Sequence, residues 1–144
     1  MPASSRPVPR SSDRPAETGA GARTGPFATC VAAWLVPGAG HLLQGQAQKA
    51  VVFFVTLVAM FVIGIGFHGR VLPFQTAEPL VFLAAAAQWV LGLPRIVATI
   101  GGFGAGDVVS VTYEYGNTFL IVAGLLNALV MLDAFDLSTG RKRR

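Results

Sequence analysis

The chain has 144 residues, of which 53% are hydrophobic and 12% are charged, with a formal net charge of +4. Soluble domains carry about 25% charged residues, so this composition excludes a soluble globular domain and predicts an integral membrane protein. The basic residues gather at the two ends of the sequence rather than along a folded surface, which argues against nucleic acid as a partner.

Residues 1–26 contain five prolines, many small or polar residues and no apolar run. This composition cannot bury a core and is typical of disordered segments. We expect 1–26 to be a disordered cytoplasmic tail.

Four apolar stretches follow, each 17 to 21 residues long: 27–43, 50–67, 80–100 and 118–134. A helix rises about 1.5 Å per residue and needs about 17–25 apolar residues to cross a hydrocarbon core about 30 Å thick. The pattern predicts an all-α, four-transmembrane-helix bundle of antiparallel hairpins over 27–137, with the lipid bilayer as its surroundings. Residues 138–144 form a basic cytoplasmic tail in this interpretation.

The first stretch is interrupted by Pro37, Gly38 and Gly40. Proline removes a helical hydrogen bond to the carbonyl four residues earlier, so we expect a kink, and the glycines allow a neighbouring backbone to approach closely. A re-entrant segment is the alternative to a kinked span. His41 follows the break, and we expect it to bond to the adjacent loop or to a partner protein.

The third stretch contains Pro94 and Arg95. The 14 residues before them would extend about 21 Å, too short to cross, so we expect the span to continue through a kink to Ile100. Arg95 then lies partly inside the membrane, where arginine either snorkels to the interface or is paired. Its candidate partners are Asp107 and Glu114.

The fourth stretch carries Asn127 near its centre, and Gln88 lies at a similar depth on the third. Amide side chains facing lipid would lack partners, so we expect these two to contact each other. Asp133 and Asp136 are three residues apart and share a helix face. We expect them to pair with arginines at the cytoplasmic boundary rather than to bind metal, the candidates being Arg23, Arg70 and Arg141.

Four spans place both termini on one side, together with the loop that carries Arg70. Nine of the eleven Lys and Arg residues then share that side, against Lys49 and Arg95 on the other. By the positive-inside rule both termini are cytoplasmic. For a bacterial chain, the corresponding location is the cell inner membrane, with a multi-pass topology.

Two segments carry a resemblance: WLVPGAGHLLQG at 34–45, and YEYGNTFLIVAGLLNALVMLDAFDLSTGRK at 113–142. They resemble an uncharacterised family of small bacterial multi-pass membrane proteins, classed as a domain of unknown function. The first segment is also distantly similar to the two-helix transmembrane-hairpin domain. The resemblance implies an integral membrane protein, and no activity comes with the family.

We expect no catalytic residue, no metal-ligand set and no cofactor, because no nucleophile is placed beside a base. The two histidines, His41 and His68, lie on opposite sides of a four-span bundle, so no haem can join them. The sequence therefore favours a non-catalytic accessory, stabilising or assembly subunit that packs against other integral membrane subunits or itself. The alternative is a small oligomeric transporter or channel, which the intramembrane polar residues and the broken first helix suggest.

Overall fold

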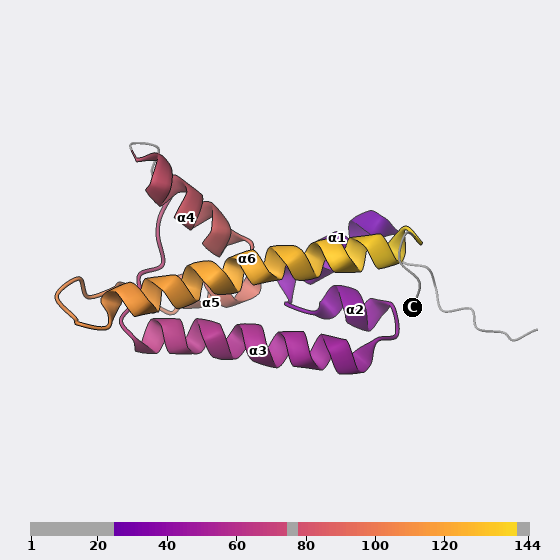
Figure 1. The fold of residues 1–144 in the computed structure, drawn as a ribbon, viewed down its shortest axis with the longest axis horizontal. Helices are drawn as coiled ribbons and strands as arrows, with labels where there is room; N and C mark the ends of the chain where they lie inside the picture. The colour runs from indigo at the N-terminus through magenta and orange to yellow at the C-terminus, as the bar shows by residue number, and fades with distance from the viewer. Residues whose placement is uncertain (1–24, 75–77, 141–144) are drawn as a thin grey trace, which may run out of the picture.

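A computed structural model describes residues 25–74 and 78–140 of the chain (Figure 1). Within these ranges its regular elements are all helices, without a strand. The helices are α1 (Pro26–Leu35), α2 (Ala39–Leu43), α3 (Ala47–Gly66), α4 (Pro79–Trp89), α5 (Leu93–Ile100) and α6 (Tyr113–Ser138). The predicted all-α class is confirmed, while most of the two predicted tails lies outside the described residues.

Two helices are long and apolar enough to cross a membrane by themselves. They are α3, with 20 residues, and α6, with 26 residues. The pair α4 and α5 passes the same criterion only together, and it is bent by 106°. The described chain therefore has two candidate spans, or three if the bent pair counts as one, and the predicted four-helix bundle is not confirmed.

The helices α3 and α6 run antiparallel as the central column of the molecule (Figure 1). Their closest approach is at glycines, because a Cβ atom added to Gly116 would overlap the backbone of Gly64 and Gly69. Small residues at such a crossing let the two backbones pack without bulky side chains between them. α6 also contacts α1, α2 and α4, so it is the element on which the others assemble.

The first apolar stretch does not cross the molecule. α1 runs to its middle, where the carbonyl of Ala33 lies beside Asn127 of α6, and α2 then returns, so that Gln44 bonds to the Ala134 carbonyl near the end of α6. Val36 is extended, as expected before Pro37, and Gly38 has a φ of +83°, which together reverse the chain. The predicted kinked span is not confirmed here, and the reversal of the chain has the geometry of the re-entrant alternative.

The third stretch forms a second hairpin from the opposite end. α4 runs inward to Trp89, the chain turns at Gly92 with a φ of +57°, and α5 leads back outward (Figure 1). The predicted kink underestimates the bend between the two helices. A glycine with a positive φ directly before Leu93 and Pro94 prevents the helix from continuing. Each half of the described chain is thus a short-helix hairpin followed by one long helix.

This arrangement moves two basic residues relative to the sequence prediction. Lys49, at the start of α3, lies at the end of the molecule where the described chain begins and finishes, whereas Arg70 follows α3 at the other end (Figure 1). The four-span assignment had these two exchanged, because it counted the first stretch as a crossing.

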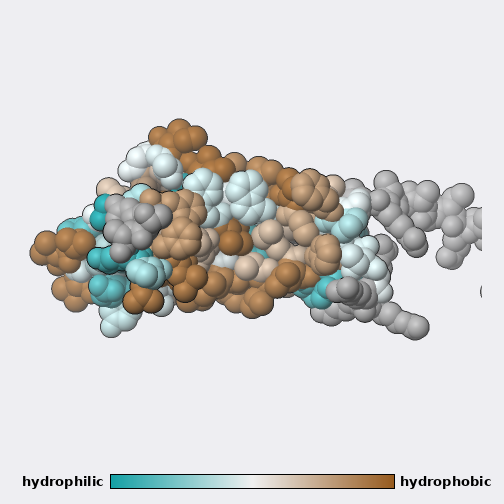
Figure 2. Space-filling model, turned by 90° about the horizontal axis from the view of Figure 1, so that it is seen from above, coloured by the Kyte–Doolittle hydropathy of each residue, from teal (hydrophilic) through white to brown (hydrophobic). Residues whose placement is uncertain are grey.

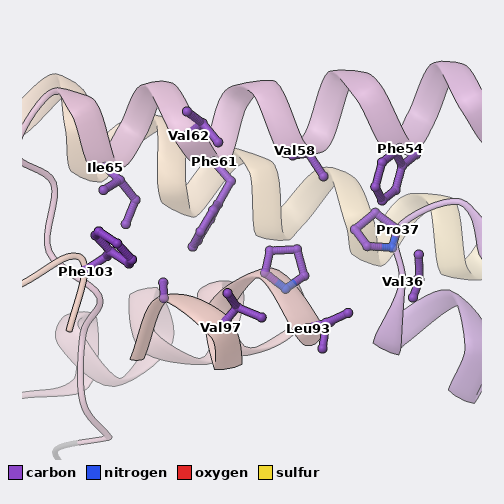
Figure 3. Close-up of a pocket in the computed structure, with 12 residues that line it drawn as sticks. Val36, Pro37, Phe54, Val58, Phe61, Val62, Ile65, Leu93, Val97 and Phe103 are labelled. Atoms are coloured by element: carbon purple, nitrogen blue, oxygen red, sulfur yellow. The ribbon is translucent and has the colours of Figure 1, made fainter. Parts of the chain in front are cut away.

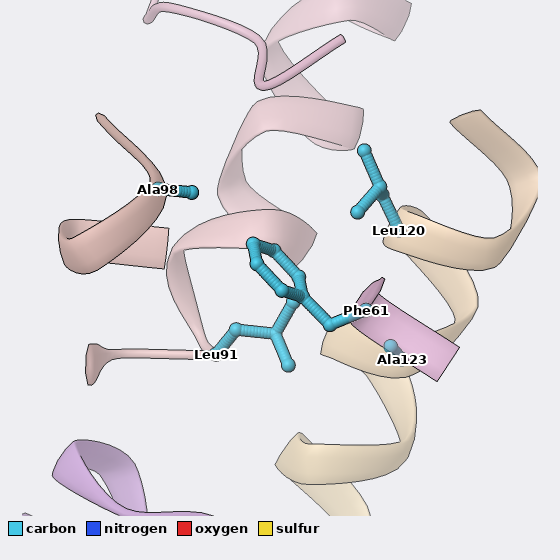
Figure 4. Packing of buried hydrophobic residues seen from close by; sticks show 5 residues of the cluster. All are labelled: Phe61, Leu91, Ala98, Leu120 and Ala123. Carbon is cyan, nitrogen blue, oxygen red and sulfur yellow. The ribbon is translucent and has the colours of Figure 1, made fainter. Parts of the chain in front are cut away.

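The surface and the core agree with a membrane protein. Apolar residues cover both long edges in Figure 2, and strongly hydrophilic residues gather near the two ends. Inside, Phe61 of α3 packs with Leu91, Ala98, Leu120 and Ala123, so the second hairpin is joined to the column by an apolar cluster (Figure 4).

Candidate functional site: the junction of two hairpins

The tips of the two hairpins meet halfway along α6, and each tip contains a proline. Proline has no N–H group, so the carbonyl four residues before it loses its usual helical donor. For Pro37 that carbonyl belongs to Ala33, and for Pro94 it belongs to Val90. Both carbonyls lie at a depth where water is absent if the molecule is in a bilayer, so each needs a donor from the protein.

Asn127 of α6 supplies both donors. Its side-chain nitrogen donates to the Val90 carbonyl at 2.7 Å and to the Ala33 carbonyl at 3.5 Å. An asparagine amide has two N–H groups, one for each carbonyl. The side chain is completely buried, and its Oδ1 atom is buried without a hydrogen-bond partner among the described residues. One side chain therefore joins both hairpins to the spanning helix.

Direct contacts between the tips close this junction. The indole nitrogen of Trp34 donates to the carbonyl of Trp89 at 3.0 Å. A Cβ atom at Gly92 would overlap the carbonyl oxygen of Trp34, and one at Gly124 would overlap that of Ala87. The backbones are in contact at these points, so no solute fits directly between Trp34 and Gly92 or between Ala87 and Gly124.

A second polar cluster fixes the outer side of the α4–α5 hairpin. Gln88, 1% exposed, accepts from the Leu72 backbone nitrogen at 2.9 Å and donates to the Arg70 carbonyl at 3.1 Å. Arg95, 7% exposed, donates to Gln88 Oε1 at 3.3 Å and to the Leu72 carbonyl at 2.8 Å, and its guanidinium lies 4.9 Å from the Trp89 ring centroid. These contacts attach the hairpin to the connector that follows α3.

Two sequence predictions for these residues are not confirmed. Gln88 and Asn127 are both buried as expected, but within the described residues they are hydrogen bonded to backbone groups and to Arg95, and not to each other. Among the ion pairs of the described residues, none joins Arg95 to Asp107 or Glu114. Backbone carbonyls take the donors instead: those of the broken helices accept from Asn127, and those of the connector after α3 accept from Gln88 and Arg95.

At the other end of the column, His41 joins the first hairpin to α6. Its Nε2 atom lies 2.9 Å from Asp133 Oδ2, and its ring is fully buried beside Phe53, with centroids 5.1 Å apart. The Nδ1 atom of His41 is buried without a partner among the described residues. The prediction that His41 bonds to an adjacent loop is therefore wrong, since its partner is 92 residues away in sequence.

The predicted partner Arg70 is excluded for Asp133, because Arg70 lies at the opposite end of the column. Arg23 and Arg141 lie outside the described residues, so the expected pairing of Asp136 with them stays a prediction. The expected role of Asp133 in holding the bundle together is compatible with its bond to His41.

The sequence analysis missed Trp34, Trp89 and Gly92. A signal for them exists: in each broken stretch a tryptophan stands a few residues before the proline, and the turn contains a glycine. The carbonyl of Val90 was findable in the same way as that of Ala33, by counting back four residues from the proline.

Comparison with known proteins places the chain in a family. The model of a family described as a family of unknown function, DUF6677, matches residues 28–143. The protein belongs to DUF6677. The match spans every helix that forms the junction, so the predicted resemblance to an uncharacterised family is confirmed. No curated protein and no solved structure gave a significant match to this DUF6677 chain.

We predict that Asn127→Leu lowers the free energy of unfolding of this DUF6677 protein by about 1–3 kcal/mol, because it leaves two buried carbonyls without donors. Thermal unfolding of the purified protein in mild detergent measures the change. Thr56→Val is the matched control, since Thr56 is an exposed polar residue of α3 that makes no hydrogen bond within the described residues. Equal stability of both variants and the native protein would contradict the role of Asn127.

A double-mutant cycle tests the end contact. We expect His41→Ala and Asp133→Ala to show a coupling energy of about 1 kcal/mol, because the two side chains are hydrogen bonded. Arg70→Ala and Asp133→Ala should be additive within about 0.5 kcal/mol, since the residues lie at opposite ends. Coupling of Asp133 to Arg70 instead of His41 would show that the third stretch crosses the membrane.

Proposed function

We propose that this DUF6677 protein is a non-catalytic, multi-pass subunit of the bacterial inner membrane that packs against other integral membrane proteins and stabilises their assembly. The proposal is supported most directly by the hydrogen bonds of the polar residues within the apolar stretches. Asn127 is hydrogen bonded to the main chain of both hairpins, and Gln88 and Arg95 are hydrogen bonded to the main chain of the connector after α3. Their donors hold the fold together instead of lining an open path.

The partner surface in this proposal is the outer half of α4. The C-terminal half of α4 packs on α6, where Ala85, Ala87 and Gln88 are buried. Towards Pro79 the helix diverges from the column (Figure 1), and Leu80 and Leu83 are 81% and 67% exposed. With 11 residues, or about 17 Å, α4 is too short to span the bilayer. A neighbouring protein helix would cover the exposed apolar side chains of its outer half.

The orientation in this proposal places both termini in the cytoplasm. Four arginines precede the described chain, four basic residues follow it, and Lys49 lies at the same end. That is nine of the eleven basic residues, with Arg70 at the opposite end and Arg95 buried between. The positive-inside rule supports the cytoplasm as the side that holds these nine basic residues. Lys49 is one of the nine here, whereas the sequence analysis counted Arg70 in its place.

The second candidate is a small oligomeric transporter or channel. The observation that favours it is the meeting of two broken segments halfway along the column, as in transporters whose discontinuous helices form a site near the bilayer midplane. The close contact of the tips at Trp34 and Gly92 argues against it, because a solute needs space there.

Site-specific photocrosslinking in cells distinguishes these candidates. A photoreactive amino acid at Leu83 should give one adduct of defined mass with a different membrane protein, which also co-purifies stoichiometrically in mild detergent. The same residue at Leu129, an exposed apolar position of α6, is the control and should not give that adduct. An adduct of Leu83 with a second copy of the chain would favour the transporter, and the absence of any protein adduct would overturn the accessory role.

A further inference from the structure

An apolar cavity of about 410 Å³, open to the surface where Val62, Val97 and Phe103 are exposed, lies between α3, α5 and the turn that joins α1 to α2 (Figure 3). Phe54, Val58 and Phe61 point into it from α3, and Val97 faces them from α5. Every residue that lines it is apolar. Its size falls in the range of about 300–1,000 Å³ that is usual for ligand sites in proteins.

The cavity is a direct consequence of the two broken helices. Pro37 and Pro94 both line it, at the points where the hairpins turn. α2 leads away from this space, whereas α5 forms one of its walls through Val97 and Ala98. Val58 and Ala98 on the facing helices are too small to fill what remains.

The surroundings determine what fills such a space. Ordered water requires polar partners, which this lining does not offer. Phe54, Val58 and Phe61 belong to the interior of a 20-residue apolar helix, so the cavity lies at the depth of lipid hydrocarbon when α3 spans the bilayer. A flexible hydrocarbon chain is therefore the chemically matched occupant.

The end of the cavity carries a group suited to a lipid headgroup. Phe103 closes this end from the loop after α5. The next residues of that loop pair with the connector after α3, since the Val71 backbone nitrogen donates to the Gly104 carbonyl at 2.8 Å and Arg70 forms a bridge with Ala105. Arg70 is exposed there, and none of the ion pairs between described residues includes it.

We propose that the cavity binds one acyl chain of an anionic phospholipid whose phosphate is held by Arg70. A guanidinium and a phosphate form charge-assisted hydrogen bonds, and a basic residue near a membrane surface attracts anionic lipid. The lipid belongs to the leaflet at the Arg70 end of the molecule. This inference requires the chain to lie in a bilayer, but it does not require a partner protein.

Photolabelling of the full chain in vesicles tests the acyl-chain site. The probe is a diacyl phospholipid with a diazirine in mid-chain, and adducts are mapped by mass spectrometry. We expect adducts on Val58 and Val97 to exceed those on Val52, which lines a separate groove between α3 and α6. Val58→Phe should reduce the adducts on Val97 several-fold, whereas Val52→Phe, the same change on the same helix, should leave them unchanged.

The headgroup is tested by comparing phosphatidylglycerol with phosphatidylcholine probes of identical chains. We expect about a fivefold preference for phosphatidylglycerol, the effect of one basic residue at a membrane surface. Arg70→Gln should remove this preference, and Lys49→Gln, which removes one positive charge at the other end, should preserve it. A preference that survives Arg70→Gln would overturn the headgroup assignment.

If a variant fails to fold, photolabelling of the native protein alone can still disprove the acyl-chain site. Adducts spread evenly over the exposed apolar positions of α3, without excess at Val58 and Val97, would show that lipid contacts the surface and does not enter the cavity. A missing partner protein would not produce that result, so failure of the accessory role remains distinguishable.

Discussion

In the proposed bilayer setting, two prolines and the absence of water set the main constraint on this structure. A carbonyl freed by proline in a soluble protein bonds to solvent, but one in hydrocarbon has only the protein. Ala33 and Val90 carry such carbonyls in two segments that are distant in sequence, and Asn127 serves both. The hairpins must therefore meet at one depth of α6, and the rest of the arrangement follows from that meeting.

The position of α6 explains why a small chain holds so many short helices. The isolated helices α2 and α5, with 5 and 8 residues, are too short to be stable by local hydrogen bonding. Each is attached by contacts outside its own helix: α2 through His41 and Gln44 to the end of α6, and α5 through Arg95 to Gln88 and the connector after α3. Hydrogen bonds of polar side chains thus provide the stabilisation that these helices are too short to obtain from their own backbone hydrogen bonds.

Much of this fold follows from sequence, and the remainder does not for a definite reason. Hydropathy locates all four apolar stretches, and proline locates both breaks. Hydropathy cannot distinguish a span from a hairpin, because 17 apolar residues suffice for either one crossing or two half-crossings. The discriminating feature is the left-handed glycine beside each proline, Gly38 and Gly92, which turns a kink into a reversal.

The polar residues show the same boundary between what is and is not predictable. Burial of Gln88 and Asn127 follows from their depth in apolar stretches. Their partners do not, because a broken helix creates backbone acceptors that a residue-by-residue reading leaves out. His41 and Asp133 would likewise lie on opposite sides if the third stretch crossed between them, and the reversal at Gly92 brings them together.

Cysteine accessibility is the most direct test of the central claim that the first stretch is a hairpin. Single cysteines at the exposed positions Gly25, Gln48, Val109 and Thr139, in a Cys30→Ser background, are labelled in sealed vesicles with a membrane-impermeant maleimide. The account predicts that Gly25→Cys, Gln48→Cys and Thr139→Cys react from one side, and Val109→Cys from the opposite side. Labelling of Gly25→Cys and Gln48→Cys from opposite sides would mean that the first stretch spans the membrane, and would contradict the account.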